Sequence, residues 1–175
     1  LHKQLVFQDG KIILLGQPAF ILPGITIVSL IKRLEKTNNE NLVYQACKDE
    51  GLDWFTNMYK VFKIKKQDVI DWGLKLINLA GYGRASIIKM DQENKMMVFT
   101  LEDSTVAQLY GKSEKCVDHL FRGYAAGAGD LLFDGGCEGV EISCIAKGDK
   151  VCKFVIKKRE MFDLSDPQVK SQLQS

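Results

Sequence analysis

The sequence lacks a long hydrophobic run and lacks an excess of charge of either sign. Its longest apolar stretch, residues 20–31, is interrupted by Pro23 and Gly24 and is shorter than the roughly 18 to 20 residues that a membrane-spanning helix needs. We therefore predict no membrane span. The 24 basic and 22 acidic side chains leave a net charge of +2. Because proteins that follow phosphate backbones usually carry a basic surface, we predict no nucleic-acid partner.

Signatures of catalysis and of export are also missing. The chain has no P-loop, no G-x-S-x-G motif and no nucleotide fingerprint after a strand, and its two histidines are His2 and His119. We predict no catalytic residue. The N-terminal residues lack the apolar core and cleavage site of a secretory signal, so we expect a cytoplasmic protein. Its five cysteines are then thiols or metal ligands rather than a disulfide framework.

What the sequence does contain is enough apolar material for one core. With 46% hydrophobic residues in 175, we predict a single domain over residues 1–175. Within it we expect an N-terminal hairpin region (1–24), a helical region (25–83), a core of strands, a helix and a hairpin (84–158), and a C-terminal tail (159–175). Strands at both ends with helices between them predict an α+β fold, with one antiparallel sheet and helices packed on one face.

The hydrophobic periodicity locates the expected elements. Asp9 and Gly10 predict a turn between two N-terminal strands. Separate helices are expected at about 27–37, 40–51, 55–62 and 69–80, because apolar residues there recur at helical spacing. Ser113 is expected to cap a long helix that carries Cys116 and runs to about residue 133. Strands are expected at 84–90, 95–101, 140–146 and 151–156.

Four of the five cysteines lie in the last third of the chain. A three-residue loop over 147–149 would place Cys144 directly opposite Cys152 on a hairpin, where two thiolates could share a zinc ion. Cys116 is a candidate third ligand, and either His119 or Cys137 a candidate fourth. The alternative is that these thiols are buried as small hydrophobic groups and that His119 is an ordinary polar residue of the helix.

The stretch from about 111 to 158 resembles the 4-vinyl-reductase domain family. The resemblance rests on Cys116, on a helix rich in Gly and Ala, and on the run Glu141-x-x-Cys144-x₇-Cys152-x-Phe154. It implies a ligand-binding α+β domain of the type found in NO signalling and Golgi transport, often homodimeric. In the aromatic-sensing members a zinc ion is held by residues that correspond to Cys116, Glu141, Cys144 and Cys152.

One geometric condition accompanies this ligand set. In a regular strand Glu141 and Cys144 face opposite sides, because side chains alternate. If Glu141 is a ligand, a β-bulge or a loop must precede Cys144. Cys137 is the reserve ligand if Glu141 points away.

The three glycines between residues 123 and 129 are costly inside a helix, at about 1 kcal/mol each relative to Ala. Either another helix or the sheet approaches closely there, or the bare backbone leaves room for a ligand. Aromatic residues that would line such a space are Trp54, Phe55, Tyr59, Trp72 and Tyr124.

These observations favour a domain that binds or senses a hydrophobic or aromatic small molecule and contains a structural zinc site. One alternative is an enzyme or enzyme subunit that acts on a tetrapyrrole-like vinyl substrate, although no redox-cofactor motif accompanies the family name. A second alternative is a dimeric scaffolding subunit, which would show no cavity.

Overall fold

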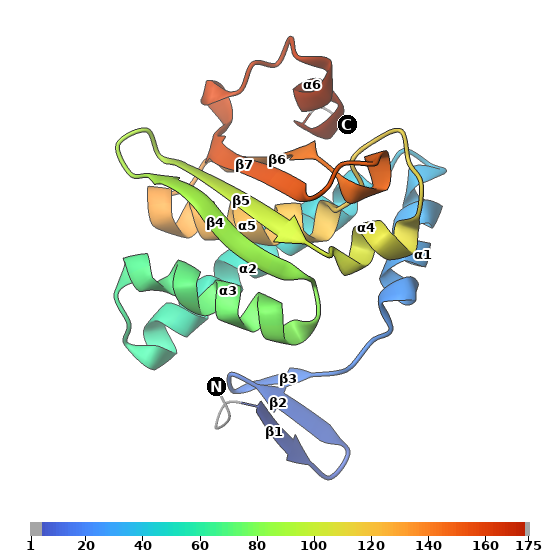
Figure 1. The fold of residues 1–175 in the computed structure, drawn as a ribbon. Helices are drawn as coiled ribbons and strands as arrows, with labels where there is room; N and C mark the ends of the chain where they lie inside the picture. The colour runs from blue at the N-terminus through green and yellow to red at the C-terminus, as the bar shows by residue number, and fades with distance from the viewer. Residues whose placement is uncertain (1–4, 174–175) are drawn as a thin grey trace.

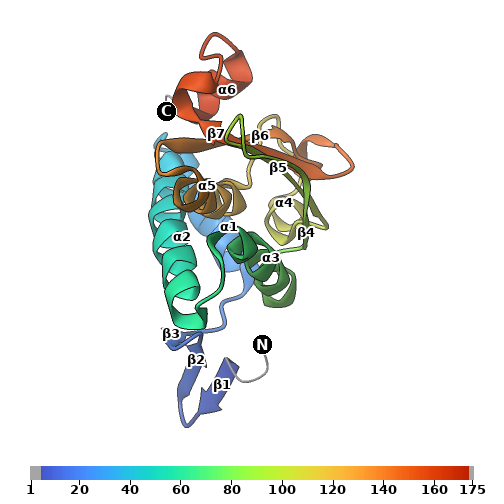
Figure 2. The same cartoon turned by 90° about the vertical axis from the view of Figure 1, so that its left-hand side faces the viewer.

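The computed structural model describes residues 5–173 of the chain. Residues 1–4 and 174–175, the ends of the predicted hairpin region and tail, lie outside the described residues. The chain first forms a small antiparallel sheet from β1 (Leu5–Gln8), β2 (Lys11–Leu14) and β3 (Gln17–Ala19). The Asp9–Gly10 turn joins β1 to β2 as predicted. This sheet projects from one end of the molecule (Figures 1 and 2).

The larger sheet is antiparallel, with the strand order β4-β5-β7-β6. Its strands are β4 (Arg84–Asp91), β5 (Met96–Glu102), β6 (Cys137–Ser143) and β7 (Cys152–Lys158). Alternate residues of the two central strands, such as Phe99 and Leu101 on β5 and Phe154 and Ile156 on β7, are at most 3% exposed. These side chains form the sheet's half of the main hydrophobic core, which confirms the predicted α+β fold.

Six α-helices accompany the sheets in the described residues. They are α1 (Gly24–Glu35), α2 (Asn41–Phe62), α3 (Val69–Ala80), α4 (Thr105–Tyr110), α5 (His119–Phe133) and α6 (Pro167–Leu173). Helix α5 lies against one face of the larger sheet, and α2 packs along α5 on the side away from the sheet (Figure 2). None of the helices in residues 5–173 is long and apolar enough to cross a membrane.

Helix α2 is one continuous helix, so the predicted break at Gly51 is wrong. Gly51 lies inside the helix. A glycine is needed there, because a methyl group would stand 3.0 Å from the backbone of Tyr124 on α5. The glycine marks a close helix contact rather than a helix end.

Two glycines of α5 serve the same contact. A Cβ atom at Gly123 would lie 2.5 Å from the carbonyl oxygen of Tyr44, and one at Gly127 would lie 2.4 Å from that of Lys48. The two helices therefore meet backbone to backbone, which is the first of the two explanations for the glycine-rich stretch. Gly129 faces the sheet instead, where a Cβ would lie 2.7 Å from Ile156.

The long helix begins later than predicted. Asp118, not Ser113, caps α5, since its side chain accepts a hydrogen bond from the amide of Phe121 at 3.1 Å. A separate short helix, α4, precedes it and is capped by Ser104. Cys116 therefore lies in the loop before α5 and not on its helical face.

The predicted tail contains α6, which packs on the opposite face of the larger sheet over β6. Val169 and Leu173 of this helix form a second cluster with Val140 on β6 and with Phe162. Figure 1 shows α6 on the far side of the sheet from α5. The C-terminal segment thereby covers the strand that carries Glu141.

Candidate metal centre and apolar cavity

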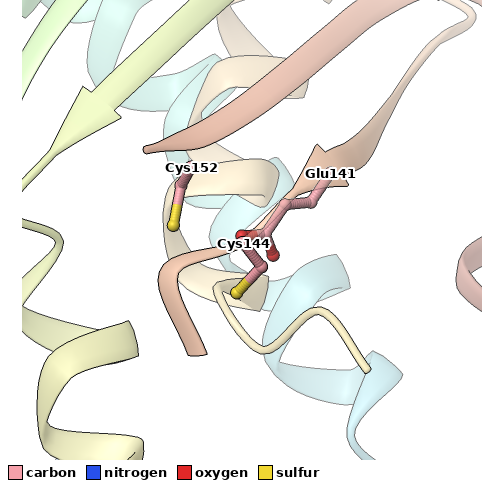
Figure 3. Close-up of side chains that lie close together, drawn as sticks. All are labelled: Glu141, Cys144 and Cys152. Carbon is pink, nitrogen blue, oxygen red and sulfur yellow. The ribbon is translucent and has the colours of Figure 1, made fainter. Parts of the chain in front are cut away.

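Glu141, Cys144 and Cys152 form a buried group at the end of β6. One donor atom from each lies within 4.8 Å of the others, so the group could hold a metal ion. All three side chains are at most 1% exposed. Figure 3 shows the Glu141 carboxylate next to Cys144, with the sulfur of Cys152 approaching from the start of β7.

A β-bulge brings Glu141 and Cys144 to the same side. The register between β6 and β7 shifts between Glu141 and Ser143, which is the irregularity that the ligand set required. The strand then ends, and Cys144 follows in extended conformation.

The predicted three-residue hairpin loop is wrong. A 3₁₀ turn, Ile145–Lys147, follows Cys144 and lengthens the connection to β7. Asp149 holds this turn, since its carboxylate accepts a hydrogen bond from the amide of Cys144 at 2.8 Å. Cys144 is therefore not paired with Cys152 in the sheet, but the turn folds back so that the amide of Ile145 lies 3.4 Å from the Cys152 sulfur.

Cys116 joins the group through Cys144. Its thiol is within hydrogen-bonding range of the Cys144 sulfur and lies 3.2 Å from the carbonyl oxygen of Glu141. The loop before α5 thus places a third sulfur beside Cys144, outside the group of Glu141, Cys144 and Cys152.

The electrostatics of the group centre on Cys144. The neighbouring Cys116 and Cys152 thiols, and after them the Glu141 carboxyl, lower the pKa of the Cys144 thiol, while its burial acts in the opposite direction. The pKa values of Cys116 and Cys152 are raised, first by the neighbouring Cys144 and second by burial. Burial, followed by the nearby Asp118, also raises the pKa of Glu141. Buried sulfur and carboxyl groups that shift one another's pKa values in this way form an arrangement in which a cation can replace protons.

The Glu141 carboxylate is fixed by one oxygen only. Its Oε2 atom accepts a hydrogen bond from the amide of Asp118 at 3.0 Å, while Oε1 is buried without a partner among residues 5–173. Because a buried acceptor without a partner is costly, this free oxygen fits a role as a metal ligand.

The two alternative ligands lie outside the group. Cys137 opens β6 and lies under Gly129 of α5. His119 is directed at Arg122, with its Nδ1 atom 3.4 Å from the guanidinium. Of the three candidates for the fourth position, the structure brings Glu141 next to Cys144 and Cys152.

The sequence did not reveal the residues that hold this group in place. Gln168 and Gln172 of α6 each donate to the carbonyl oxygen of Glu141 at 2.9 Å, and the Gln172 side chain also accepts from the Glu141 amide. Neither glutamine stands in a motif. Asp118 is of a residue type that often caps helices, and this could have identified it as the start of α5. The sequence analysis assigned that role to Ser113 instead.

An apolar cavity lies between α2, α3, α5 and the larger sheet. It has about 10 Å³ of free volume and is lined only by apolar side chains: Phe55, Ile70, Leu74, Ile77, Phe99, Phe121, Ala125 and Ala128. The ring of Phe55 leans over Gly73, where a Cβ atom would stand 2.3 Å from the ring. In this state the aromatic rings fill most of the space.

Of the five predicted ligand-binding residues, Phe55 lines this cavity. Trp54 packs edge-on against Phe55, with ring centroids 5.0 Å apart, and Trp72 stacks on Phe62 at 5.3 Å. Tyr124 contacts Tyr82, and Tyr59 is 38% exposed. Trp54, Tyr59, Trp72 and Tyr124 are not among the residues that line the cavity.

Comparison with known proteins supports this description of a small α+β domain. Residues 97–158 match the family model of the 4-vinyl-reductase domain, which confirms the resemblance to that family. No curated protein matches the chain.

Three solved structures share the fold. The phenol-responsive sensory domain of the transcription activator PoxR, solved with phenol, aligns over 98% of this chain and 93% of its own length, with a TM-score of 0.79 and 21% identity. A vinyl-4-reductase family protein from Methanocaldococcus jannaschii aligns over 79% of this chain and 83% of its own, with a TM-score of 0.52 and 17% identity. The trafficking protein particle complex subunit 3 from Naegleria fowleri, covalently bound to palmitic acid, aligns over 77% and 93%, with a TM-score of 0.55 and 8% identity.

Proposed function

We propose that this chain is a sensor-type domain that binds a small apolar molecule in the cavity beside Phe55 and contains a structural zinc ion. The observation that carries the proposal is the fully apolar lining of that small cavity between the helices and the sheet. The similarity in fold to a phenol-responsive sensory domain supports it.

The lining favours a hydrocarbon over a phenol. Phenol carries a hydroxyl group that needs a hydrogen-bond partner, and leaving that group unpaired costs about 1–3 kcal/mol. No described side chain around the cavity offers such a partner. We therefore propose an aromatic or aliphatic hydrocarbon as the ligand, with the rings of Phe55 and Phe121 moving apart to admit it, since a cavity that holds benzene needs about 150 Å³.

The metal is proposed to be zinc, held by Cys116, Glu141, Cys144 and Cys152. Zinc prefers sulfur ligands in a four-coordinate site, and three thiolates with one carboxylate meet that preference. Four protein ligands leave no open position for a water molecule, so the ion would fix the loop before α5 to the hairpin of β6 and β7. The five free thiols suit a reducing compartment such as the cytoplasm.

We further propose that two copies of the chain associate through the N-terminal sheet and the segment after it. Phe7, Phe20 and Ile21 are 66%, 79% and 80% exposed, and three strands of three or four residues are marginally stable without further packing. A second copy of the same apolar surface would bury these side chains.

Thermal unfolding of the full chain with toluene and with phenol tests the ligand class. Toluene is expected to raise the melting temperature at concentrations about 10-fold or more below those at which phenol does. Equal potency of the two compounds, or no effect of toluene, would contradict the proposal. Elemental analysis of protein purified without a metal-affinity step tests the ion, and one zinc per chain is expected.

A further inference from the structure

The apolar cavity has four walls, and three of them are fixed to one another by close backbone contacts. Helices α2 and α5 meet backbone to backbone at Gly123 and Gly127. The larger sheet approaches α5 in the same way, since a Cβ atom at Gly139 on β6 would lie 2.9 Å from the carbonyl oxygen of Arg122. Because backbone atoms in such contacts cannot turn aside as a side chain does, α2, α5 and the sheet form a rigid frame.

Helix α3 forms the fourth wall, and its contacts with this frame are made by side chains. It lies beside β4 (Figure 1). The residues of α3 that line the cavity are Ile70, Leu74 and Ile77. At Gly73 the nearest neighbours of an added Cβ atom are three atoms of the Phe55 ring on α2. Since side chains can separate and repack without distorting the backbone, α3 is the wall that can move.

The C-terminal end of α3 is well anchored. The Asn78 side chain exchanges two hydrogen bonds with the backbone of Ala85 on β4, at 2.6 and 3.3 Å. Thr105, the first residue of α4, donates its hydroxyl hydrogen to the carbonyl oxygen of Gly81 at 2.6 Å and its amide hydrogen to that of Tyr82 at 3.0 Å. These bonds tie this end of the helix to both neighbouring elements, so it can serve as a pivot.

The N-terminal end of α3 has a weaker anchor. Among the hydrogen bonds and ion pairs of residues 5–173, the one that joins this end to the frame is the pair between Lys66, in the 3₁₀ turn before α3, and Asp134, which follows α5. Their Nζ and Oδ1 atoms are 2.8 Å apart, and the side chains are 41% and 80% exposed. Exposed ion pairs are weak and are screened by salt. The start of α3 is therefore the part that can leave the frame most readily.

We propose that the first turns of α3 swing away from the end of α5 to admit the apolar ligand, and that the Lys66–Asp134 pair holds this entrance closed. The inference rests on the proposed function of the cavity. Pivoting on its anchored end, α3 would carry Ile70 and Leu74 outward and free the ring of Phe55 to turn. The cavity, about 10 Å³ when closed, would gain volume toward the roughly 150 Å³ that a benzene-sized ligand needs.

Exchange of fluorobenzene between its free and bound states, measured by fluorine NMR on the full chain, tests the proposal. Lys66→Met is expected to raise the rates of binding and of release about 2- to 5-fold each, because the pair no longer opposes opening. The dissociation constant should stay within about 2-fold, since the pair is present in both the empty and the occupied closed state. Lys65→Met removes an exposed charge one residue away and should change neither rate.

Asp134→Asn removes the same pair from the other side. Asparagine suits the left-handed backbone at this position, where φ is 60°, and the variant should match Lys66→Met. The double variant should be no faster than either single variant, because all three lose one and the same interaction. Added salt should speed the exchange in the parent chain and in Lys65→Met, but not in the variants that lack the pair.

Failure of the entrance and failure of the ligand site give different results. Bound fluorobenzene that exchanges at the same rates in Lys66→Met and in Lys65→Met would overturn the moving wall and leave the ligand site intact. Faster release without faster binding would also overturn it, because the pair would then stabilise the bound state rather than close an entrance. If the parent chain shows no saturable binding of fluorobenzene, the ligand site itself is contradicted, and this inference with it.

Discussion

The backbone amide of Asp118 holds one oxygen of the Glu141 carboxylate at 3.0 Å and leaves the other oxygen without a partner among the described residues. The cap of α5 thereby orients a side chain on β6 toward Cys144. A residue of the loop that carries Cys116 thus positions a carboxylate from a distant strand.

Glu141→Gln should weaken zinc binding by at least about 10-fold, because the amide can still accept from Asp118 but contributes no negative charge to the ion. Competition with a coloured chelator measures the affinity. Glu160→Gln, an exposed change in the 3₁₀ turn after β7, is the control. An unchanged affinity in Glu141→Gln would remove this residue from the ligand set.

Metal affinity should increase with pH. In the metal-free protein the pKa values of Cys116, Cys152 and Glu141 are raised, so these groups hold protons at neutral pH that a cation must displace. Titrations in buffers of different ionisation enthalpy measure the protons released. Binding without proton release would show that the ion does not enter this group.

His119 should make the fold less stable in acid. Burial lowers its pKa from 6.5 to about 3. Between these values the unfolded chain takes up a proton that the folded chain does not, so this contribution to stability is complete above about 6.5 and is lost as the pH falls toward 3. In this range the free energy of unfolding changes by at most about 1.4 kcal/mol per pH unit through this group. The free energy of unfolding of His119→Gln, measured with urea from pH 7 to pH 4, should fall less steeply than that of the parent chain. An equally steep fall would show that the imidazole is exposed to water.

Leu74→Ala should enlarge the apolar cavity and tighten toluene binding while lowering the free energy of unfolding by about 1–3 kcal/mol, less than for a fully buried leucine because this side chain is half-buried. Leu79→Ala changes the same residue type on the same helix where the side chain is 63% exposed, and it should affect neither quantity. Chemical unfolding with and without toluene measures both. If Leu74→Ala lowers stability without any gain in toluene binding, the ligand binds elsewhere.

Gly127→Ala should destabilise the fold by about 1–3 kcal/mol or more, because the new methyl group would stand 2.4 Å from the carbonyl oxygen of Lys48, and backbone atoms do not move aside readily. Lys60→Ala, an exposed change on α2, should stay within about 0.5 kcal/mol. Denaturant midpoints compare the two. A neutral Gly127→Ala would mean that the helices are further apart than the structure places them.

Replacing both Phe20 and Ile21 with Asp should convert a dimer to a monomer, because the charges would be buried at the proposed interface. Light scattering after size exclusion gives the mass. Val61→Asp, a change at an exposed apolar residue of α2, should leave the mass unchanged. A parent chain that is monomeric at all concentrations would contradict the interface.

The sequence predicted the parts of the site that follow from chemistry and strand periodicity. Glu141, Cys144 and Cys152 come together, and the register of β6 against β7 shifts before Cys144, which is the condition for Glu141 and Cys144 to share one site. Loop conformation was harder to predict, because the Lys147–Asp149 stretch that favours a tight hairpin is preceded by a 3₁₀ turn stabilised by Asp149.

The helix boundaries were predicted wrongly where packing overrides local preference. Gly51 ends a helix by propensity, yet the contact with Tyr124 makes a glycine necessary within α2. The predicted ligand-binding residues stay a prediction, because aromatic spacing on a helix does not show which ring faces an open space; the Trp72 ring, for example, stacks on Phe62.

The contacts of Gln172 bear on how the chain can be shortened. The residues that match the 4-vinyl-reductase domain end at 158, whereas Gln172 binds both Arg122 and the backbone of Glu141, and Tyr44 covers the Arg122 guanidinium from α2. A fragment trimmed to the matched residues would expose a guanidinium and a strand edge that the complete chain shields. Any truncation meant to isolate the cysteine group should therefore retain both flanking helices.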